Sequence, residues 1–279
     1  MASRDSRFIS LKPKTRAQVV EVTDARINAL HRVIAKLIPG ITPQLNCFTY
    51  KSFYSPLTRS EHLASLMHIV PALCDELSPI QTCIEVNGSV KIAGELPVTG
   101  SLVRESYCEV DTERLHRRSK LIPVMVHNRY LAAGKEFLNE SILLHYRLKP
   151  QLFGATWIDT VHAPDLFDVT LCLDESVLLS FVSLQAYAER TSFDYEYVTQ
   201  TLGCPGLLVP MDLLGLLLLV LLGQKKPRRK IKWLEYHIYG QIFTGQPVRL
   251  CATVLDSNKI LMWAESADYL IYRGIVHLV

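Results

Sequence analysis

The residues that most often bind metals or carry redox chemistry are scattered along this 279-residue chain. Its seven cysteines form no C-x-x-C pair, and its nine histidines do not combine with them at zinc-ligand spacing. His62 and His68 are six residues apart in an expected helix, so they do not share a face. We therefore expect no metal and no bound cofactor, and reduced, mostly buried thiols. The cysteines are Cys47, Cys74, Cys83, Cys108, Cys172, Cys204 and Cys251.

Positive charge gathers in one place, the run of residues 225–230, which Lys232 continues. Such a run is typical of a solvated loop, but it could also bind phosphate, including an RNA backbone, and Arg228, Arg229 and Lys230 are the candidate contacts. A second basic segment covers residues 114–120. Neither run is interleaved with aromatic residues, as single-strand binders usually are. The net charge is only +3, so any surface for an anionic partner must be local.

Two further charged features have simple structural interpretations. Arg190 and Asp194 stand four residues apart, which predicts an ion pair on a helical turn. Asp212 precedes a long apolar run, which predicts a helix N-cap.

The composition indicates a folded chain with a full core, since 49% of residues are hydrophobic and 20% are charged. Residues 213–222 are apolar except for Gly215, but this run is half of the roughly twenty residues that cross a bilayer. We expect a buried core helix there and no membrane span. The N-terminal segment is basic and contains Asp5 but no apolar stretch, so we do not expect secretion, and the segment is a candidate mitochondrial presequence. Otherwise we expect a cytoplasmic protein.

The first half should form an N-terminal extension (residues 1–37) and a first folded unit (residues 38–150). Helical spacing of apolar residues in the extension includes Val20, Ile27, Leu30, Val33, Ile34 and Leu37. In the unit, Thr58 and Glu61 form a capping box that opens a helix to about Leu77. Strand-like runs follow at residues 83–92, 101–110, 121–128 and 140–148.

The second half repeats this order after a linker at residues 151–165, and it forms a second unit over residues 166–279. A strand at 167–173 precedes helical stretches at 178–188, 195–202 and 212–222, and strands follow at 232–242, 247–255, 259–267 and 269–278. Each half therefore combines one long apolar helix with about four strands. This order predicts an α+β fold, a double hot-dog, in which each curved antiparallel sheet wraps around a central helix and the two sheets join edge to edge.

One segment of the second unit resembles the signature of the MaoC-like hydroxyacyl-thioester dehydratases. That signature reads His-Tyr-Asp-x-(Asp/Glu)-Tyr-Ala, four residues, then Gly-Tyr-Pro-Gly-Leu-Val-Val-His-Gly-Pro-Leu. Here residues 192–198 read Ser-Phe-Asp-Tyr-Glu-Tyr-Val and residues 203–209 read Gly-Cys-Pro-Gly-Leu-Leu-Val, without a gap in spacing. The matching residues are Arg190, Asp194, Glu196, Tyr197, Gly203, Pro205, Gly206, Leu207, Val209 and Leu213. Residues 56–58 and 114–119 resemble the first unit of the same proteins more loosely.

The resemblance implies a reaction, the reversible addition of water to a 2-enoyl thioester. In the family an Asp or Asn and a His, five residues apart, hold the water, and a backbone N–H at the start of the central helix polarises the thioester carbonyl. These positions are Tyr187 and Ser192 here, and the His-Gly pair that opens the helix is Pro210-Met211. An unassisted serine is no general base at neutral pH, and the reference pKa of tyrosine is near 10. Met211 places a side chain where glycine lets the thioester approach, whereas Pro210 still suits a first helical turn.

We therefore expect a catalytically degenerate dehydratase-like protein that is a structural or binding subunit of a larger, mitochondrial assembly. One alternative is an active 3-hydroxyacyl-thioester dehydratase or 2-enoyl-CoA hydratase that uses other residues. Another is a non-catalytic sensor of an acyl thioester or its pantetheine arm, with coenzyme A or an acyl carrier protein as ligand or partner. In that case Gly206, Arg228, Arg229 and Lys230 would contact the thioester and its phosphate.

Overall fold

The computed structural model describes residues 16–41, 45–54, 82–110, 121–147, 156–157, 163–185, 190–267 and 269–279. The helix expected from Thr58, the segment 114–119 and Tyr187 lie outside these residues.

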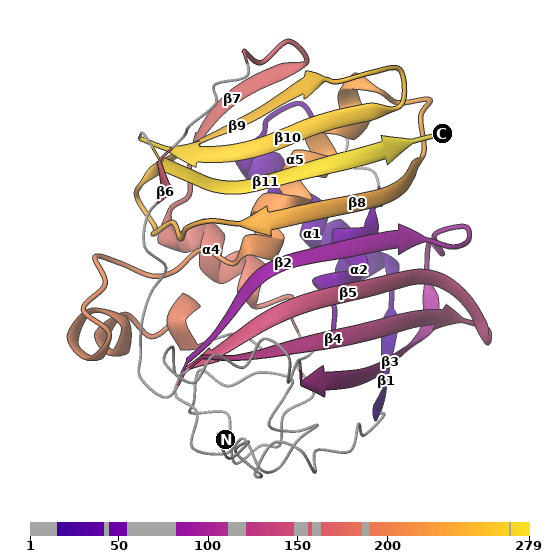
Figure 1. Cartoon of the computed structure of the whole chain (residues 1–279), viewed down its shortest axis with the longest axis horizontal. Coiled ribbons are helices and arrows are strands. Elements are labelled where there is room, and N and C mark those ends of the chain that lie inside the picture. Colours follow the sequence, from indigo (N-terminus) through magenta and orange to yellow (C-terminus); the bar gives the residue numbers. More distant parts are fainter. Residues whose placement is uncertain are drawn as a thin grey trace, which may run out of the picture.

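The strands form a single antiparallel sheet that runs the length of the molecule (Figure 1). Its order is β1-β3-β4-β5-β2-β8-β11-β10-β9-β7, and the short β6 pairs with β11. The strands are β1 Arg16–Val22, β2 Thr82–Ile92, β3 Gly100–Val110, β4 Leu121–Ala132, β5 Lys135–Arg147, β6 Thr156–Trp157, β7 Phe167–Cys172, β8 Ile231–Ile238, β9 Pro247–Val254, β10 Lys259–Ser266 and β11 Tyr269–Leu278.

The sheet contains the same strand order twice, which confirms the predicted double hot-dog. β1-β3-β4-β5-β2 in the first half corresponds to β7-β9-β10-β11-β8 in the second. The halves join edge to edge, as predicted, because β2 pairs with β8 and places Gly88 opposite Tyr236. A Cβ atom on Gly88 would collide with the Tyr236 hydroxyl, so the absence of a side chain leaves room for this ring where β2 pairs with β8.

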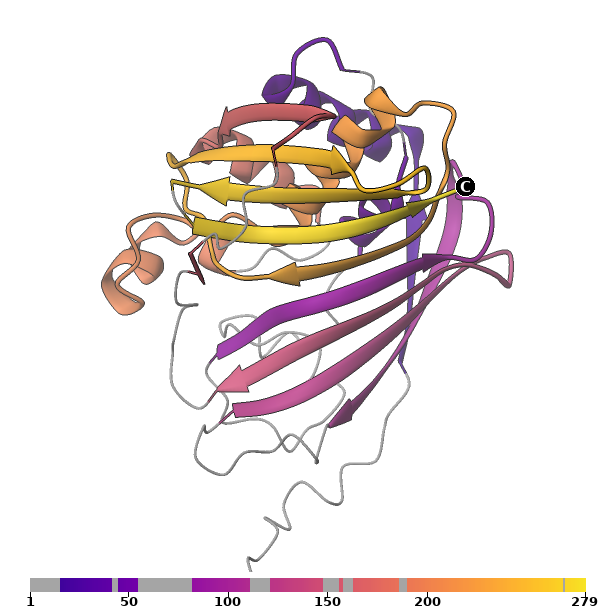
Figure 2. The same cartoon turned by 45° about the horizontal axis from the view of Figure 1, so that its top comes forward.

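The helices lie together on one face of the sheet (Figures 1 and 2). They are α1 Asp24–Leu37, α2 Cys47–Lys51, α4 Glu175–Val182 and α5 Met211–Lys225, with a 3-10 turn η3 at Arg190–Ser192 and a π-type turn η4 at Tyr197–Thr201. The Thr23 side chain caps α1, and the apolar residues predicted from Ile27 to Leu37 form its buried face. Val20, expected on this helix, instead lies on β1, the edge strand that pairs with β3.

The apolar helix α5 is the core element of the second unit, as predicted. Each residue from Leu213 to Leu222 is buried. The ring of Phe48 lies so close to Gly215 that a Cβ atom there would be 2.7 Å from it, which brings α2 directly against α5. No helix in the described part of the chain is long and apolar enough to cross a membrane.

Several elements differ from the prediction at their ends. The helix expected to reach residue 188 ends as α4 at Val182, and the helix expected at residues 195–202 is mainly the π-type turn η4, Tyr197–Thr201. The strand expected at 140–148 begins earlier, at Lys135. Neither α2 nor β6 was predicted. The cysteine side chains that the structure describes are free thiols, and all except that of Cys172 are buried.

Candidate functional site

Ser192, the residue at the family's histidine position, is buried and already bonded. It ends the turn η3 and is 1% exposed. Its hydroxyl donates to the backbone carbonyl of Leu208 at 3.0 Å, and the Leu208 N–H donates to the Thr191 carbonyl at 2.9 Å. Ser192 therefore connects the turn η3 by a hydrogen bond to the segment that precedes α5.

The start of α5 is occupied by Pro210 and Met211, as the alignment of the motif predicts. Pro210 is the N-cap residue with φ −59°, so the helix begins although no side chain caps it. Met211 is partly buried and packs against the core. The prediction that Asp212 is the N-cap is wrong, because Asp212 is the second residue of the helix.

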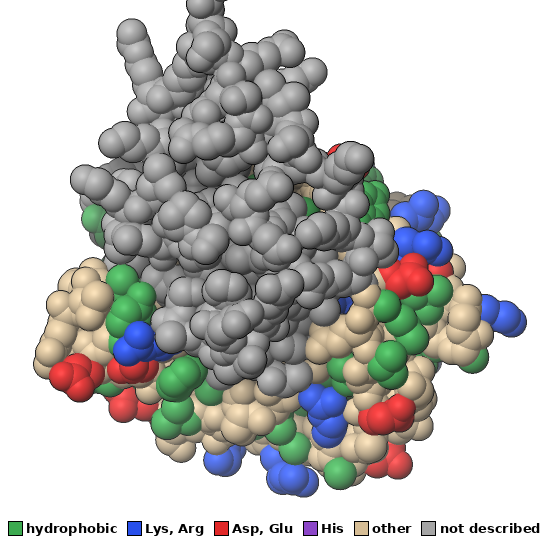
Figure 3. Space-filling model, turned by 90° about the horizontal axis from the view of Figure 1, so that it is seen from below, with side chains coloured by type: hydrophobic (Ala, Val, Ile, Leu, Met, Phe, Trp, Pro, Cys, Tyr) green, Lys and Arg blue, Asp and Glu red, His purple; other side chains and the backbone are tan. Residues whose placement is uncertain are grey.

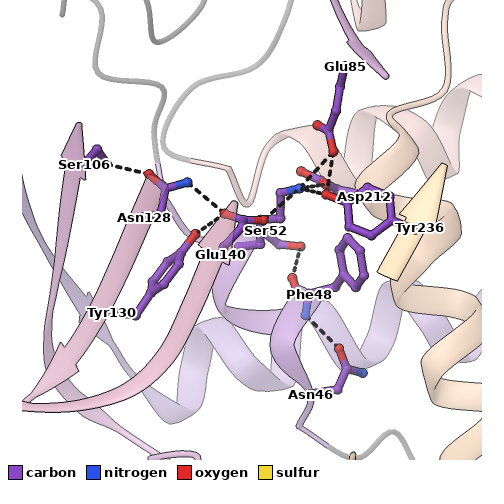
Figure 4. Close-up of polar contacts among 11 residues, drawn as sticks. Asn46, Phe48, Ser52, Glu85, Ser106, Asn128, Tyr130, Glu140, Asp212 and Tyr236 are labelled. Carbon is purple, nitrogen blue, oxygen red and sulfur yellow. Dashed lines mark hydrogen bonds and ion pairs between the residues drawn. The ribbon is translucent and has the colours of Figure 1, made fainter. Parts of the chain in front are cut away.

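Asp212 belongs instead to a buried cluster around the ammonium group of Lys51, the last residue of α2. The Lys51 Nζ lies 2.9 Å from Asp212 Oδ1, 3.1 Å from Glu140 Oε1 and 3.4 Å from Glu85 Oε1. It also donates to the Tyr236 hydroxyl at 3.1 Å, and that hydroxyl donates to Glu85 at 2.6 Å. The side chains of Lys51 and Glu140 are 10% and 2% exposed. We call these five residues the Lys51 cluster (Figure 4).

The cluster joins the two halves of the molecule. Lys51, Glu85 and Glu140 come from α2, β2 and β5 of the first half, whereas Asp212 and Tyr236 come from α5 and β8 of the second. The cluster therefore lies beside the β2–β8 pairing.

A polar chain continues from Glu140 across the first half of the sheet (Figure 4). Its Oε2 accepts from the Asn128 amide at 2.8 Å and from the Tyr130 hydroxyl at 3.0 Å. The Ser106 hydroxyl donates to Asn128 Oδ1 at 2.6 Å. These bonds satisfy Oε2 of a carboxylate that is costly to bury, whereas Oε1 has the charge of Lys51 beside it but no hydrogen bond from the described residues.

The electrostatics of the cluster keep the lysine charged and make one carboxyl easy to protonate. Burial raises the pKa of Glu85 to about 7, with Asp212 and Glu140 adding to the rise against the opposing pull of Lys51 and the Tyr236 hydrogen bond. Burial alone would lower the pKa of Lys51, but Asp212, Glu140 and Glu85 outweigh it and hold that pKa well above its usual value. The side chains of Glu85 and Asp212 remain 23% and 25% exposed, so both are in contact with solvent.

The Lys51 cluster reduces the ability of the N-terminal end of α5 to bind an anion. A helix N-terminus carries about half a positive charge, which can stabilise an anion or a developing oxyanion. Here that charge already faces the carboxylate of Asp212, and Lys51 neutralises the carboxylate. Within the described residues, no group of three or more His, Cys, Asp or Glu is placed to hold a metal ion.

The remaining candidate residues lie at opposite ends of α5. Gly206 precedes the helix and packs against Thr244, whereas Arg228, Arg229 and Lys230 follow its C-terminal end and are exposed. The 15-residue helix is roughly 22 Å long, and its middle is fully buried. The structure therefore does not bring Gly206 together with the basic residues.

Near the motif, the predicted ion pair is confirmed. Arg190 Nε lies 2.7 Å from Asp194 Oδ2. The guanidinium also lies over the ring of Tyr197, 4.0 Å from its centroid. These matching residues of the motif therefore hold the turn between η3 and η4 in place.

Sequence reasoning missed the Lys51 cluster, although one signal was present. Residues 47–54 read Cys-Phe-Thr-Tyr-Lys-Ser-Phe-Tyr, which is a run of apolar and aromatic residues around a single lysine. A lysine in a segment that is otherwise buried requires anionic partners. The identity of those partners could not be read from the sequence, because they lie on four other elements.

No family model matches the chain, and no curated protein matches it in sequence. Solved structures match it closely in fold. A MaoC-like dehydratase from Phytophthora capsici superposes with a TM-score of 0.68 at 11% identity, over 98% of each chain. HtdX from Mycobacterium tuberculosis gives 0.64 at 11% identity, over 94% of this chain and 98% of the other.

An acyl-ACP thioesterase from Bacteroides thetaiotaomicron also matches over the whole of both chains, with a TM-score of 0.50 at 10% identity. Since both dehydratases and a thioesterase share the architecture, these matches identify the fold and not the reaction. The chain therefore has the double hot-dog fold of the MaoC-like dehydratase structures over nearly its whole length.

Proposed function

We propose that the chain is a catalytically degenerate relative of the hydroxyacyl-thioester dehydratases that acts as a structural or binding subunit of a larger assembly. The observation that carries this proposal is the Asp212–Lys51 ion pair at the start of α5. Hydration of an enoyl thioester builds negative charge on the carbonyl oxygen, and the family stabilises that charge at this helix end. Here the positive end of the helix already faces the carboxylate of an internal ion pair, so little of its charge is available to stabilise a second negative charge.

The state of Ser192 supports the same conclusion. Its hydroxyl hydrogen is committed to the Leu208 carbonyl, and the residue is buried. A hydroxyl in that position cannot take a proton from water at neutral pH, its hydrogen is not free to bind a water, and its burial separates it from solvent.

The direct test is the hydration of a short 2-enoyl-CoA by the purified full chain, followed as loss of absorbance of the conjugated thioester. We expect a rate equal to that of buffer alone. A rate clearly above buffer that Ser192→Ala or Tyr187→Phe abolishes would overturn the proposal, because it would show that the motif positions still do chemistry.

A second candidate function is a working hydratase or dehydratase that uses other residues, and one observation favours it. Burial raises the pKa of Glu85 to about 7, and this carboxyl accepts a hydrogen bond from Tyr236 beside Asp212. A carboxyl that titrates near neutral pH could supply a general acid or a general base. This candidate predicts turnover that survives Ser192→Ala but is lost in Glu85→Gln and in Asp212→Asn.

A third candidate, the sensor of an acyl thioester or an acyl carrier protein, predicts saturable coenzyme A binding without turnover. Isothermal calorimetry with coenzyme A tests it, and neutralising Arg228 and Arg229 should weaken the binding. The separation of these residues from Gly206 along α5 argues against a single thioester site that uses both ends.

For the cellular location we propose mitochondria, on the basic N-terminal segment and the family resemblance alone. Fractionation against a matrix marker tests this, and recovery of the protein only in the cytosol would refute it.

A further inference from the structure

A row of side chains crosses the face of the sheet that is turned away from the core. Cross-strand pairing puts Lys259 opposite His277, His277 opposite Trp233, and Trp233 opposite Lys91. The row continues through Asn139 to Arg129. Directly paired residues project from the same face of a sheet. We call these six residues the outer row.

The neighbours of the outer row establish which way it faces. Leu234 and Val276, which follow Trp233 and precede His277, are buried in the core, so the alternating positions point outward. Lys259 and Lys91 are exposed, and Trp233 and His277 are partly exposed. Six neighbouring strands are about 4.8 Å apart, so the row is roughly 24 Å long.

The basic run meets the outer row at one edge of the molecule. The Arg229 guanidinium donates to the Ser257 carbonyl at 3.2 Å and to Asn258 Oδ1 at 2.6 Å, and the Lys230 and Val279 backbones are bonded to each other. Figures 1 and 2 show the α5–β8 connection, the β9–β10 hairpin and the end of β11 side by side. The run and the row therefore form one continuous surface.

The charge of this surface is strongly one-sided. Its cationic residues are Lys91, Lys225, Lys226, Arg228, Arg229, Lys230, Lys232 and Lys259. Among the described residues, the acidic side chains beside this surface are Glu235, two residues after Trp233 on β8, and Asp256 in the β9–β10 hairpin. At the far end of the row, Arg129 is neutralised by Glu105 and Glu136. On the face seen in Figure 3, by contrast, basic and acidic side chains of the described residues are mixed.

Aromatic rings lie within the same surface. The rings of Trp233 and His277 are stacked, with centroids 4.8 Å apart and planes at 28°. Residues 225–232 contain no aromatic residue, but the pairing of β8 with β11 places the Trp233–His277 pair directly beside them. Proteins that bind single strands without sequence preference combine a positive track with aromatic stacking surfaces.

We propose that the outer row and residues 225–232 form a binding surface for single-stranded nucleic acid. An elongated track of cations with a planar aromatic pair fits a flexible chain of phosphates and bases. An anionic membrane would engage the exposed Val254 and Leu255 at the hairpin, so binding to it should depend on these two residues more than on the Trp233–His277 pair. The inference does not depend on the loss of dehydratase chemistry, since an active hydratase could carry the same surface.

The test is a titration of the full chain with a fluorescein-labelled single-stranded RNA of about a dozen nucleotides, read by anisotropy. Lys230→Glu with Lys232→Glu should weaken binding by at least about tenfold and make the salt dependence shallower by about 1.4, since each single-strand phosphate contact contributes roughly 0.7 to the slope. Trp233→Leu should weaken binding about fivefold or more and leave the slope unchanged.

The matched control is Arg32→Glu with Lys36→Glu, which makes the same change in net charge at exposed positions of α1, on the opposite face of the sheet. We expect it to change the affinity by less than about twofold. Circular dichroism of every variant checks that it is folded, and the 2-enoyl-CoA assay on the same variants reports separately on the proposed function.

Three results would overturn the inference. The first is no RNA binding by the wild-type chain at about 100 mM salt. The second is an equal loss of RNA affinity in the Lys230→Glu, Lys232→Glu variant and in the Arg32→Glu, Lys36→Glu control. The third is an affinity for phosphatidylserine vesicles that exceeds the affinity for RNA and is unaffected by Trp233→Leu.

Discussion

Replacing Glu85 by glutamine should make the protein more stable at pH 8. The pKa of Glu85 is about 7 in the folded chain against an ordinary value of 4.5, a difference of about 2.5 units. At 1.36 kcal/mol per unit, the ionised carboxylate costs the folded state about 3 kcal/mol once the pH is above 7. Glutamine has nearly the same shape, can still accept the Tyr236 hydrogen bond, and carries no charge.

The pH dependence has a definite sign. A raised folded pKa means that the folded state binds the proton more tightly than the unfolded chain does. The stability from that proton is fully present below about pH 4.5 and is lost as the pH rises through 7. The advantage of Glu85→Gln should therefore be about 3 kcal/mol at pH 8 and fall below about 1 kcal/mol at pH 5.

Urea unfolding at pH 8 and at pH 5, followed by circular dichroism, measures both values. Glu235→Gln is the matched control, because Glu235 lies on β8 and is exposed to solvent. A Glu85→Gln variant that is less stable than the wild type at pH 8, or whose advantage does not change with pH, would refute the reasoning. The first result would mean that Lys51 stabilises the ionised carboxyl more than burial destabilises it, and the second would mean that the two effects balance and leave the pKa unshifted.

Three other changes test the same region. Lys51→Met should lower the free energy of unfolding in urea by about 3–5 kcal/mol at pH 8, because it leaves buried carboxylates without their cation. The loss should be smaller at pH 5, and equal losses at both pH values would contradict this. Gly215→Ala should cost about 1–3 kcal/mol through collision with the Phe48 ring, and adding Phe48→Leu should recover part of it; no cost for the single change would contradict the close approach. Ser192→Ala should lower thermal stability by about 1 kcal/mol through loss of the bond to Leu208, without changing the rate in the 2-enoyl-CoA assay.

Much of the fold could be predicted from sequence because its signals are local. Strands β8 and β11 of the second half alternate between buried and less buried residues, and the apolar run after Asp212 is too uniform for anything except a core helix. The edge strand β1 was missed because Val20 also fits the helical spacing of α1, which follows it directly. The short α2 was missed because five residues give too little periodicity to detect.

The candidate site was less predictable because its members meet only in three dimensions. The residues of the Lys51 cluster lie at positions 51, 85, 140, 212 and 236. The outer row depends on the register of six strands, which the order of residues does not state. The motif around Ser192 could be recognised from the sequence because its residues lie close together along the chain. The roles inferred for Tyr187 and Met211 remain predictions.

The two ends of α5 explain why loss of dehydratase chemistry and binding of nucleic acid can be independent properties of the chain. At its N-terminal end, Asp212 is paired with Lys51, which Glu85 and Glu140 also contact, so no free positive charge is left there to act on an anionic ligand. At its C-terminal end, the helix dipole supplies only about half a negative charge, which stabilises roughly one nearby cation. Residues 225–232 carry six cations, so most of their charge has no role in the helix itself. An excess of this size, held beside stacked rings on an open sheet face, is better explained by an external anionic partner than by helix stability.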